Sequence, residues 1–269
     1  MGIPLEMTDM KRLILVAFFV TAFAAPSFAD VTIKAKASGK GMGMSTDMIT
    51  TTYVKGNKMR TDTVMGDTTS TMMFDVDNQR LYSFDSKKKE ADAWDMQAFG
   101  ASMTKSVDAG GITAAIKPNG QTKQLLGKSA TGYDMEVSVP AMLGGGMKIN
   151  VVMSGPVWIV KGAPGTADYL NFYKGAIEKG WIFSDPRGAK GQPGQAKAMA
   201  EMYKQLAATG GIPYEMETNM KMSGEGPMAS VLAKMGNMGT TSTVQAVDTA
   251  TIAADVFAVP AGYKIKDQK

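Results

Sequence analysis

Short segments of alternating apolar and polar residues, separated by turn dipeptides, fill the chain between residues 31 and 94. In the first segment, Val31, Ile33 and Ala35 alternate with Thr32 and Lys34. Successive side chains of a strand point to opposite faces, so this alternation predicts a half-buried strand. Gly-Asn, Gly-Asp, Asp-Asn and Asp-Ser pairs separate the segments and favour tight turns between antiparallel strands. The predicted strands are 31–37, 48–54, 58–65, 71–76, 80–84 and 90–94.

The rest of the chain mixes helical stripes with further alternating segments. Met96, Phe99, Met103 and Val107 lie near helical spacing and predict an amphipathic helix over 96–117. Apolar stripes predict two more helices at 167–179 and 195–209, with a loop rich in glycine, proline and lysine at 181–194. The remaining predicted strands are 133–139, 147–153, 157–161, 213–222, 240–248 and a short one ending at Val259. These elements predict an α+β fold in which helices cover an open face of an antiparallel sheet.

The first 29 residues have the organisation of an export signal. Lys11 and Arg12 precede an apolar run over 13–25 and a small-residue site that ends at Ala29. This order is typical of a secretory signal peptide, and the run is shorter than the roughly 20 residues that a membrane-spanning helix needs. We predict that residues 1–29 are removed and that residues 30–269 form one domain in the periplasm or outside the cell.

The sequence contains neither histidine nor cysteine. Their absence removes the commonest general base, the commonest metal ligand and the thiol nucleophile. No spacing of the remaining residues favours a serine–lysine hydrolase or a pair of catalytic carboxylates. We therefore expect a protein without enzymatic activity, cofactor or metal, whose stability comes from packing rather than from disulfides.

Charge is modest and mixed in sign. A net charge of +4 without a basic stripe gives no reason to expect nucleic-acid binding. The segment 184–197 is slightly basic, with Arg187, Lys190 and Lys197 against Asp185. Such a segment is either a solvated loop or a peripheral contact with an anionic membrane surface. We expect a monomer.

Methionine is the most unusual residue type, with 24 in 269 residues. Thioethers favour Cu(I), and methionine pairs with one intervening residue occur at Met42 and Met44 and at Met220 and Met222. The second pair lies in an alternating segment whose period of two already places both side chains on one face. The first pair lies in a glycine-rich segment, so a copper site there is the alternative interpretation of this protein.

Two further interpretations of the methionines stay open. Methionine is flexible core padding, and it also lines cavities that adapt to variable apolar ligands. Met59, Met65 and Met216 fall on predicted inner faces beside Thr61 and Thr63. A tightly filled core would favour leucine and isoleucine at such positions. The hypothesis preferred here is a cavity, and core padding is its alternative.

Several segments in fixed order resemble a known family of exported bacterial proteins. They are "YVKGNKMRTDTVM", "TMMFDVDNQRLYSFDSKKKEADAW", "GKSATGYDMEV", "PVWIVKG" and "ADVFAVPAGYKI". In these segments the chain resembles the domain of unknown function 4412 family, which is similar in pattern to periplasmic lipoprotein carriers of the LolA/LolB type. No arginine of this chain can be matched to the residue that latches the lid of LolA-type carriers.

The resemblance implies a strongly curved antiparallel sheet, an incomplete β-barrel, with two or three helices as a lid over an apolar cavity. The expected occupant is an apolar small molecule or the acyl chain of a lipid or lipoprotein, held without catalysis. The residues expected to bind it are Tyr53, Met59, Met65, Tyr82, Trp94, Trp158, Met216, Met220 and Met222.

Overall fold

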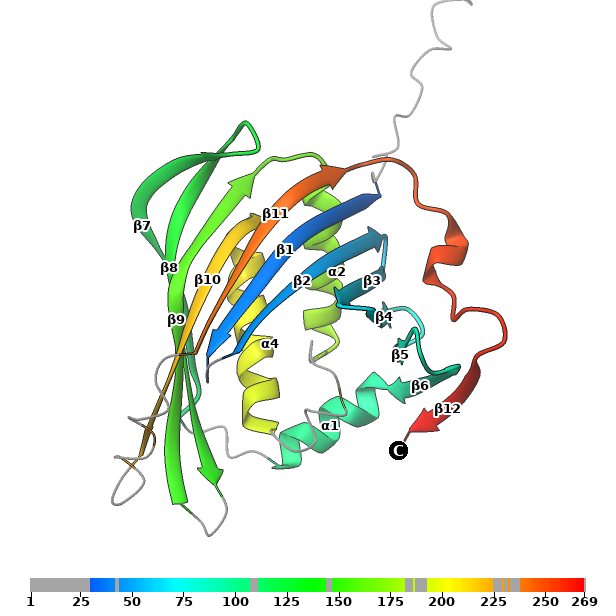
Figure 1. Ribbon diagram of the computed structural model, residues 1–269, viewed down its shortest axis with the longest axis horizontal. Coiled ribbons are helices and arrows are strands. Elements are labelled where there is room, and N and C mark those ends of the chain that lie inside the picture. Colours follow the sequence, from blue (N-terminus) through cyan, green and yellow to red (C-terminus); the bar gives the residue numbers. More distant parts are fainter. Residues whose placement is uncertain are drawn as a thin grey trace, which may run out of the picture.

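The described part of the chain forms one large sheet that curls around three helices (Figure 1). The computed structural model describes residues 30–41, 44–106, 111–143, 147–181, 186, 193–224, 229, 232 and 238–268. The strands are β1 (Val31–Gly41), β2 (Met44–Lys55), β3 (Lys58–Met65), β4 (Thr68–Asp75), β5 (Arg80–Asp85), β6 (Glu90–Asp95), β7 (Thr113–Leu125), β8 (Lys128–Leu143), β9 (Met147–Lys161), β10 (Gly211–Gly224), β11 (Met238–Asp248) and β12 (Lys264–Gln268). The helices are α1 (Met96–Ser106), α2 (Thr166–Glu178), α4 (Pro193–Ala208) and the 3-10 helix η1 (Ala254–Phe257).

The strand order is β12-β6-β5-β4-β3-β2-β1-β11-β10-β9-β8-β7, and the sheet is not closed. The six N-terminal strands pair antiparallel as successive hairpins, and the four connections from β2 to β6 fall at the predicted turn dipeptides. The second half joins this meander through β11, which pairs antiparallel with β1. The outcome is the open, strongly curved sheet with a helical side that the resemblance implied.

The helices lie on one side of the sheet, here called the inner face, and bury most of the apolar side chains. Val54, Met59, Phe74 and Leu81 of β2–β5 pack with Phe172 of α2 in one cluster. A second cluster joins inward-facing residues of β8 and β9 to α4, with Tyr133, Met135, Val137, Val157, Ile159, Ala198, Met202 and Leu206. Alternation along each strand therefore places the apolar residues under the helices and the polar ones outside.

The C-terminal segment 249–268, here called the strap, runs along the opposite, outer face of the sheet toward β6 (Figure 1). Arg60 on β3 holds it by donating from Nη1 to the carbonyl of Val256 at 2.8 Å. Tyr263 packs edge-on to Phe84, with ring centroids 5.4 Å apart. β12 then adds to the sheet edge as a strand parallel to β6.

Three sequence predictions differ from the structure. The helix starting at Met96 ends at Ser106, and residues 113–125 form β7, because Ala114 and Ile116 pack as alternating strand residues under α4. The strands predicted at 147–153 and 157–161 are one continuous β9. The short strand ending at Val259 was wrong: the chain forms η1 there, and β12 follows the Pro260–Gly262 turn.

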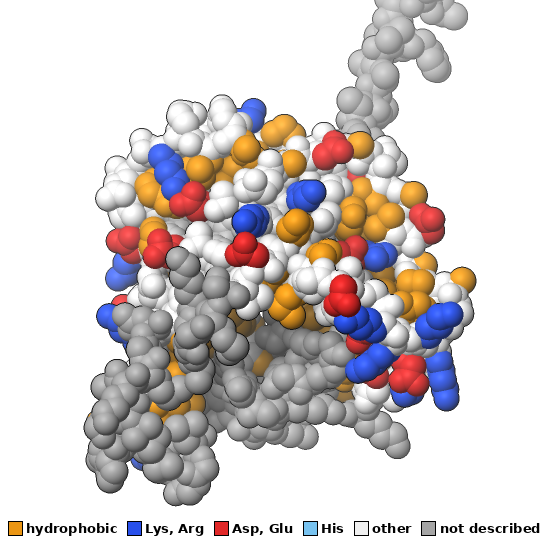
Figure 2. Space-filling view, in the orientation of Figure 1, with side chains coloured by type: hydrophobic (Ala, Val, Ile, Leu, Met, Phe, Trp, Pro, Cys, Tyr) orange, Lys and Arg blue, Asp and Glu red, His pale blue; other side chains and the backbone are white. Residues whose placement is uncertain are grey.

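The helices predicted at 167–179 and 195–209 are confirmed as α2 and α4, within two residues at each end. In the part of the chain that the structure describes, no helix is both long and apolar enough to span a membrane. The export signal predicted at 1–29 lies outside the described residues. On the face shown in Figure 2, lysine and arginine side chains lie among acidic and hydrophobic ones over the described surface rather than forming a field of one sign.

Candidate functional site

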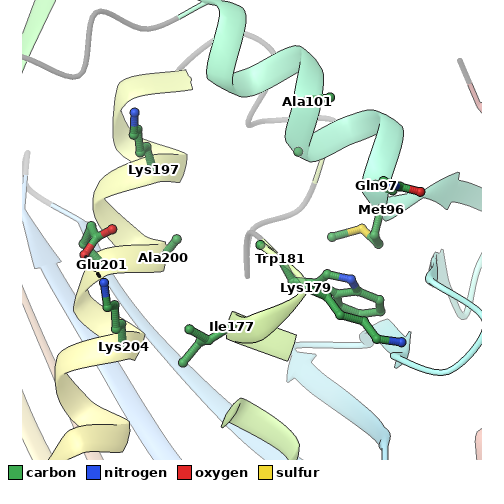
Figure 3. Close-up of a pocket in the computed structure, with 12 residues that line it drawn as sticks. Met96, Gln97, Ala101, Ile177, Lys179, Trp181, Lys197, Ala200, Glu201 and Lys204 are labelled. Atoms are coloured by element: carbon green, nitrogen blue, oxygen red, sulfur yellow. Dashed lines mark ion pairs between the residues drawn. The ribbon is translucent and has the colours of Figure 1, made fainter. Parts of the chain in front are cut away.

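A pocket of about 380 Å³ lies where the three helices meet (Figure 3). It is lined by Met96, Gln97, Gly100 and Ala101 of α1, by Ile177 of α2 with the following Lys179, Gly180 and Trp181, and by Lys197, Ala200, Glu201 and Lys204 of α4. Its size falls at the lower end of the range of about 300 to 1,000 Å³ that is usual for ligand pockets. The pocket therefore suits a small or slender molecule.

Helix α1 supplies the first wall because it begins directly after β6. Asp95, the last residue of β6, accepts a hydrogen bond at Oδ1 from the backbone N–H of Ala98 at 2.9 Å and so caps the helix. Met96 and Phe99 follow on the buried side, with 1% and 5% of their surface exposed. The cap thus fixes the direction in which the Met96 side chain enters the pocket.

The end of α2 places Trp181 by a well-defined turn. Gly180 has a φ of 71°, and the N–H of Trp181 donates to the carbonyl of Ala176 at 3.0 Å. The N–H of Gly180 donates to the carbonyl of Ile177 at 2.9 Å, which completes a Schellman motif. The turn sends the indole back against the core, where it lies 6.1 Å from the ring of Phe74.

The indole N–H of Trp181 is buried without a hydrogen-bond partner among the described residues. The side chain is 2% exposed, so water does not satisfy this donor from bulk solvent. Burying such a group unpaired costs roughly 1 to 3 kcal/mol. Figure 3 shows the nitrogen edge of the ring turned toward the side chain of Met96. The donor thus lies beneath the pocket wall, and an acceptor on a bound molecule could satisfy it once the flexible Met96 side chain turns aside.

The polar lining of the pocket has an excess of positive charge. Lys197, Lys204 and Lys179 stand against Glu201. Lys204 Nζ lies 3.8 Å from Glu201 Oε2, and both side chains are exposed, so this pair is weak. Lys179 Nζ donates to the carbonyl of Val76 at 2.8 Å, a bond that ties the end of α2 to the sheet without neutralising the ammonium. The electrostatic potential around the opening therefore favours an anion.

Three tyrosines pack between α2 and α4 beside this pocket. The rings of Tyr169 and Tyr173 have centroids 4.8 Å apart, and Tyr203 stacks on Tyr173 at 5.3 Å. Burial raises the pKa of all three phenols above the ordinary value, because the charged form loses its hydration. The hydroxyl groups therefore stay neutral at physiological pH, and the contact between the two helices is aromatic rather than ionic.

The structure buries or half-buries five of the nine predicted ligand-binding residues on the inner face. Met59 and Trp94 belong to the packed core cluster, with 5% and 4% of their surface exposed. Met216 and Met220 lie half-buried beside the α4 cluster, and Met222 follows on the same face of β10, opposite Val151. None of the five lines the helix pocket. For Met59, the packing corresponds to the core-padding interpretation.

The other four predicted residues lie elsewhere. Tyr53 pairs with Arg60, and Tyr82 pairs with Met73, so both side chains are on the outer face, where Tyr82 packs near the strap. Trp158 points away from the inward-facing Val157 and lies under the ammonium of Lys123, 4.2 Å from the ring centroid. Met65 points to the same side of β3 as Met59 but is 53% exposed at the end of the strand. The nine residues therefore do not form one lining, and their binding roles stay predictions.

The alternative copper site is not described. Met42 lies outside the described residues, and only the backbone of Met44 is described, at the start of β2. Within the described ranges, no three residues of the types His, Cys, Asp and Glu gather as a metal site would require.

Sequence reasoning missed the helix pocket. Trp181 was assigned to the start of a loop, although a large apolar residue directly after a C-terminal helix glycine is typical of a Schellman motif. That signal could have placed the indole under the end of α2. The meeting of α1 with α4 is a long-range contact, and nothing local in the sequence indicates it.

The comparisons with known proteins gave only structural matches. No protein-family model matches the chain, so the resemblance to the domain of unknown function 4412 family stays a prediction. No curated protein matches it either. The solved structures to which it is similar include a LolA superfamily protein from Nitrosomonas europaea, with 6% identity and a TM-score of 0.29, covering 86% of this chain and 91% of that one.

Two other similar structures come from different bacteria. A putative outer membrane lipoprotein-sorting protein domain from Vibrio parahaemolyticus has 10% identity and a TM-score of 0.30, with 87% of this chain and 91% of that chain covered. A DUF1329 family protein from Desulfovibrio piger has 8% identity and a TM-score of 0.29, with 86% and 90% covered. At such TM-scores the likeness is too loose to support an argument about function, which is based below on the geometry of the chain itself.

Proposed function

We propose that this is an exported, non-enzymatic binding protein that holds an apolar small molecule, or the acyl chain of a lipid partner, in the pocket between α1, α2 and α4. The observation that supports this most directly is the pocket itself, where Met96, Ile177, Ala200 and Trp181 offer apolar surface within the helical layer. Adaptable methionine and rigid aromatic walls are typical of sites that take apolar ligands.

The absence of enzymatic activity is supported by composition. The whole chain has no histidine and no cysteine, so acid–base and nucleophilic catalysis would need unusual groups. The pocket itself offers lysines and one glutamate whose carboxylate pairs with Lys204 across 3.8 Å. Binding requires none of the missing groups.

A titration with the neutral dye N-phenyl-1-naphthylamine tests the proposal. The dye is expected to fluoresce on binding, and Ala200→Phe should abolish this signal because the larger ring fills the space beside Ile177. Ala208→Phe is the matched control, since Ala208 is an exposed residue of the same helix that does not line the pocket. Dye binding that survives Ala200→Phe unchanged would contradict the proposed location.

Export has its own test. Intact-mass measurement of protein purified from an exporting host should give a chain that begins at Asp30. A native mass spectrum of the same sample, before and after delipidation, should show an additional mass that delipidation removes. A chain that keeps residues 1–29 would refute the proposal that the protein is exported but would not bear on the proposed binding pocket.

A further inference from the structure

Two features of the pocket would be left unsatisfied by a purely apolar ligand. The buried N–H of Trp181 needs an acceptor, and no described residue supplies one. Lys197 and Lys204 flank the opening on α4, and Glu201 is the one acidic residue among the described residues that line it. A hydrocarbon would leave the donor without a hydrogen-bond acceptor and the lysines without a counter-charge.

We propose that the pocket takes a single-chain amphiphile with an anionic head group, a carboxylate or a phosphate monoester, one oxygen of which accepts the Trp181 Nε1–H. This inference rests on the proposed function, because it assumes that the pocket is the binding site. The α4 lysines balance the charge of the head group, and Met96, Ile177 and Ala200 contact the chain.

An anionic acceptor fits better than a neutral one for a physical reason. Hydrogen bonds to an ionised oxygen are shorter and roughly twice as strong as those to a neutral one, most of all where water is excluded. The indole is 2% exposed, so its bond to such an oxygen would form away from competing water. An alcohol could satisfy the indole but would leave the lysine excess without a counter-charge.

One chain fits better than two because of size. The pocket holds about 380 Å³, near the small end for ligand sites, and it is open to solvent between the helices. A head group at the indole and a chain along the side chains of α1 and α4 would use this space. The lysines reach the opening on long flexible side chains, which suits carboxylates and phosphates alike.

Displacement of the bound neutral dye distinguishes the possible ligands. Dodecanoate and dodecyl phosphate should displace it at concentrations about tenfold lower than dodecanol, since one charge-assisted hydrogen bond and the lysines separate them. Inorganic phosphate alone should displace none, because it lacks the chain. Raising the salt concentration should narrow the advantage of the anions over the alcohol. Equal displacement by dodecanol and dodecanoate would overturn the inference, and so would displacement by phosphate alone.

Variants assign the effect to residues. Lys197→Gln with Lys204→Gln should reduce the advantage of dodecanoate over dodecanol about three- to tenfold, whereas Lys128→Gln, at the exposed start of β8, should leave it unchanged. Trp181→Phe should weaken dodecanoate more than dodecanol. If Trp181→Phe fails to fold, the double lysine variant still tests the preference for an anionic head group. Failure of the dye to bind the wild-type protein refutes the proposed function, whereas dye binding without a preference for anions refutes this inference only.

Discussion

The strap on the outer face and the helix pocket on the inner side differ in whether their buried polar groups have hydrogen-bond partners. Under the strap, Arg60 donates to Asp62 at 2.9 Å and to the carbonyl of Val256, and Thr71 donates to the same carboxylate at 2.7 Å. In the pocket, the N–H of Trp181 has no partner among the described residues. Paired polar groups stabilise the fold, whereas an unpaired donor beside an excess of positive charge indicates a site for a ligand.

The start of the fold belongs to the paired region. Asp30 accepts at Oδ2 from Lys55 Nζ at 2.9 Å and from the backbone N–H of Ile252 at 2.6 Å. Lys55 also donates to the carbonyl of Ile252 at 2.6 Å. The residue that would become the new N-terminus after export is thus fixed to the strap, at the opposite end of the sequence.

The largest effect should come from a change in the apolar core between the helices and the sheet, which supports the pocket. Phe172 is fully buried between α2 and the sheet, with its ring 6.5 Å from Phe74. Phe172→Ala should lower the free energy of unfolding by about 3 to 5 kcal/mol through the cavity that it leaves, and should also abolish dye binding. Chemical denaturation measures the first effect. Met65→Ala is the control: at 53% exposure it should stay within about 0.5 kcal/mol of wild type.

Arg60→Ala should weaken the attachment of the strap and leave the helix pocket unchanged. Its removal leaves Asp62 and the carbonyl of Val256 without their strong donor in a place where both side chains of the ion pair are less than a quarter exposed. We expect the free energy of unfolding to fall by roughly 1 to 3 kcal/mol, with dye affinity unchanged. A folded Arg60→Ala protein that no longer binds dye would show that strap and pocket are coupled, against the comparison drawn here.

High pH should weaken the helical side. Burial raises the pKa of Tyr173 and Tyr203 above 10.0, so the native state keeps these protons after the unfolded chain has released them. Stability therefore falls as pH rises above about 10, by up to about 1.4 kcal/mol per pH unit for each tyrosine. Tyr203→Phe should make this fall less steep, as measured by denaturation at several pH values. An unchanged slope would mean that Tyr203 ionises equally in both states.

The smallest effect is expected for a polar pair that lies in neither region. Lys36 and Asp47 form an ion pair at 3.3 Å on the outer face, with 57% and 63% of their side chains exposed. Asp47→Asn should change stability by less than about 0.5 kcal/mol and leave dye binding intact. A larger loss in thermal or chemical denaturation would mean that exposed pairs contribute as much as those under the strap.

The meander could be predicted because its information is local. Alternation in 58–65 and the Gly56-Asn57 turn define a hairpin without reference to the rest of the chain, and β3 has the predicted bounds. The pairing of β1 with β11 could not be predicted, since it joins residues about 200 positions apart. The parallel β12 was missed for the same reason, because its partner β6 lies far back in the sequence.

The candidate site was harder to predict than the fold. The alternation of residues along a strand predicts which face a side chain points to, but not what covers that face. Met59 is packed core on the inner face, whereas Met65 on the same face is exposed. Tyr53 and Tyr82 lie on the outer face, which the register of β2–β5 decides. The pocket arises from the packing of three helices, a tertiary property that no single segment encodes.

The central claim is that the indole N–H of Trp181 serves a bound ligand, and nuclear magnetic resonance can observe that proton directly. The chain has three tryptophans, so a ¹⁵N-labelled sample gives three indole signals, and Trp181→Phe assigns one of them. On titration with dodecanoate, we predict a large, saturable shift of the Trp181 signal and smaller shifts for Trp94 and Trp158. Saturable binding of dodecanoate that leaves the Trp181 signal in place would contradict the account.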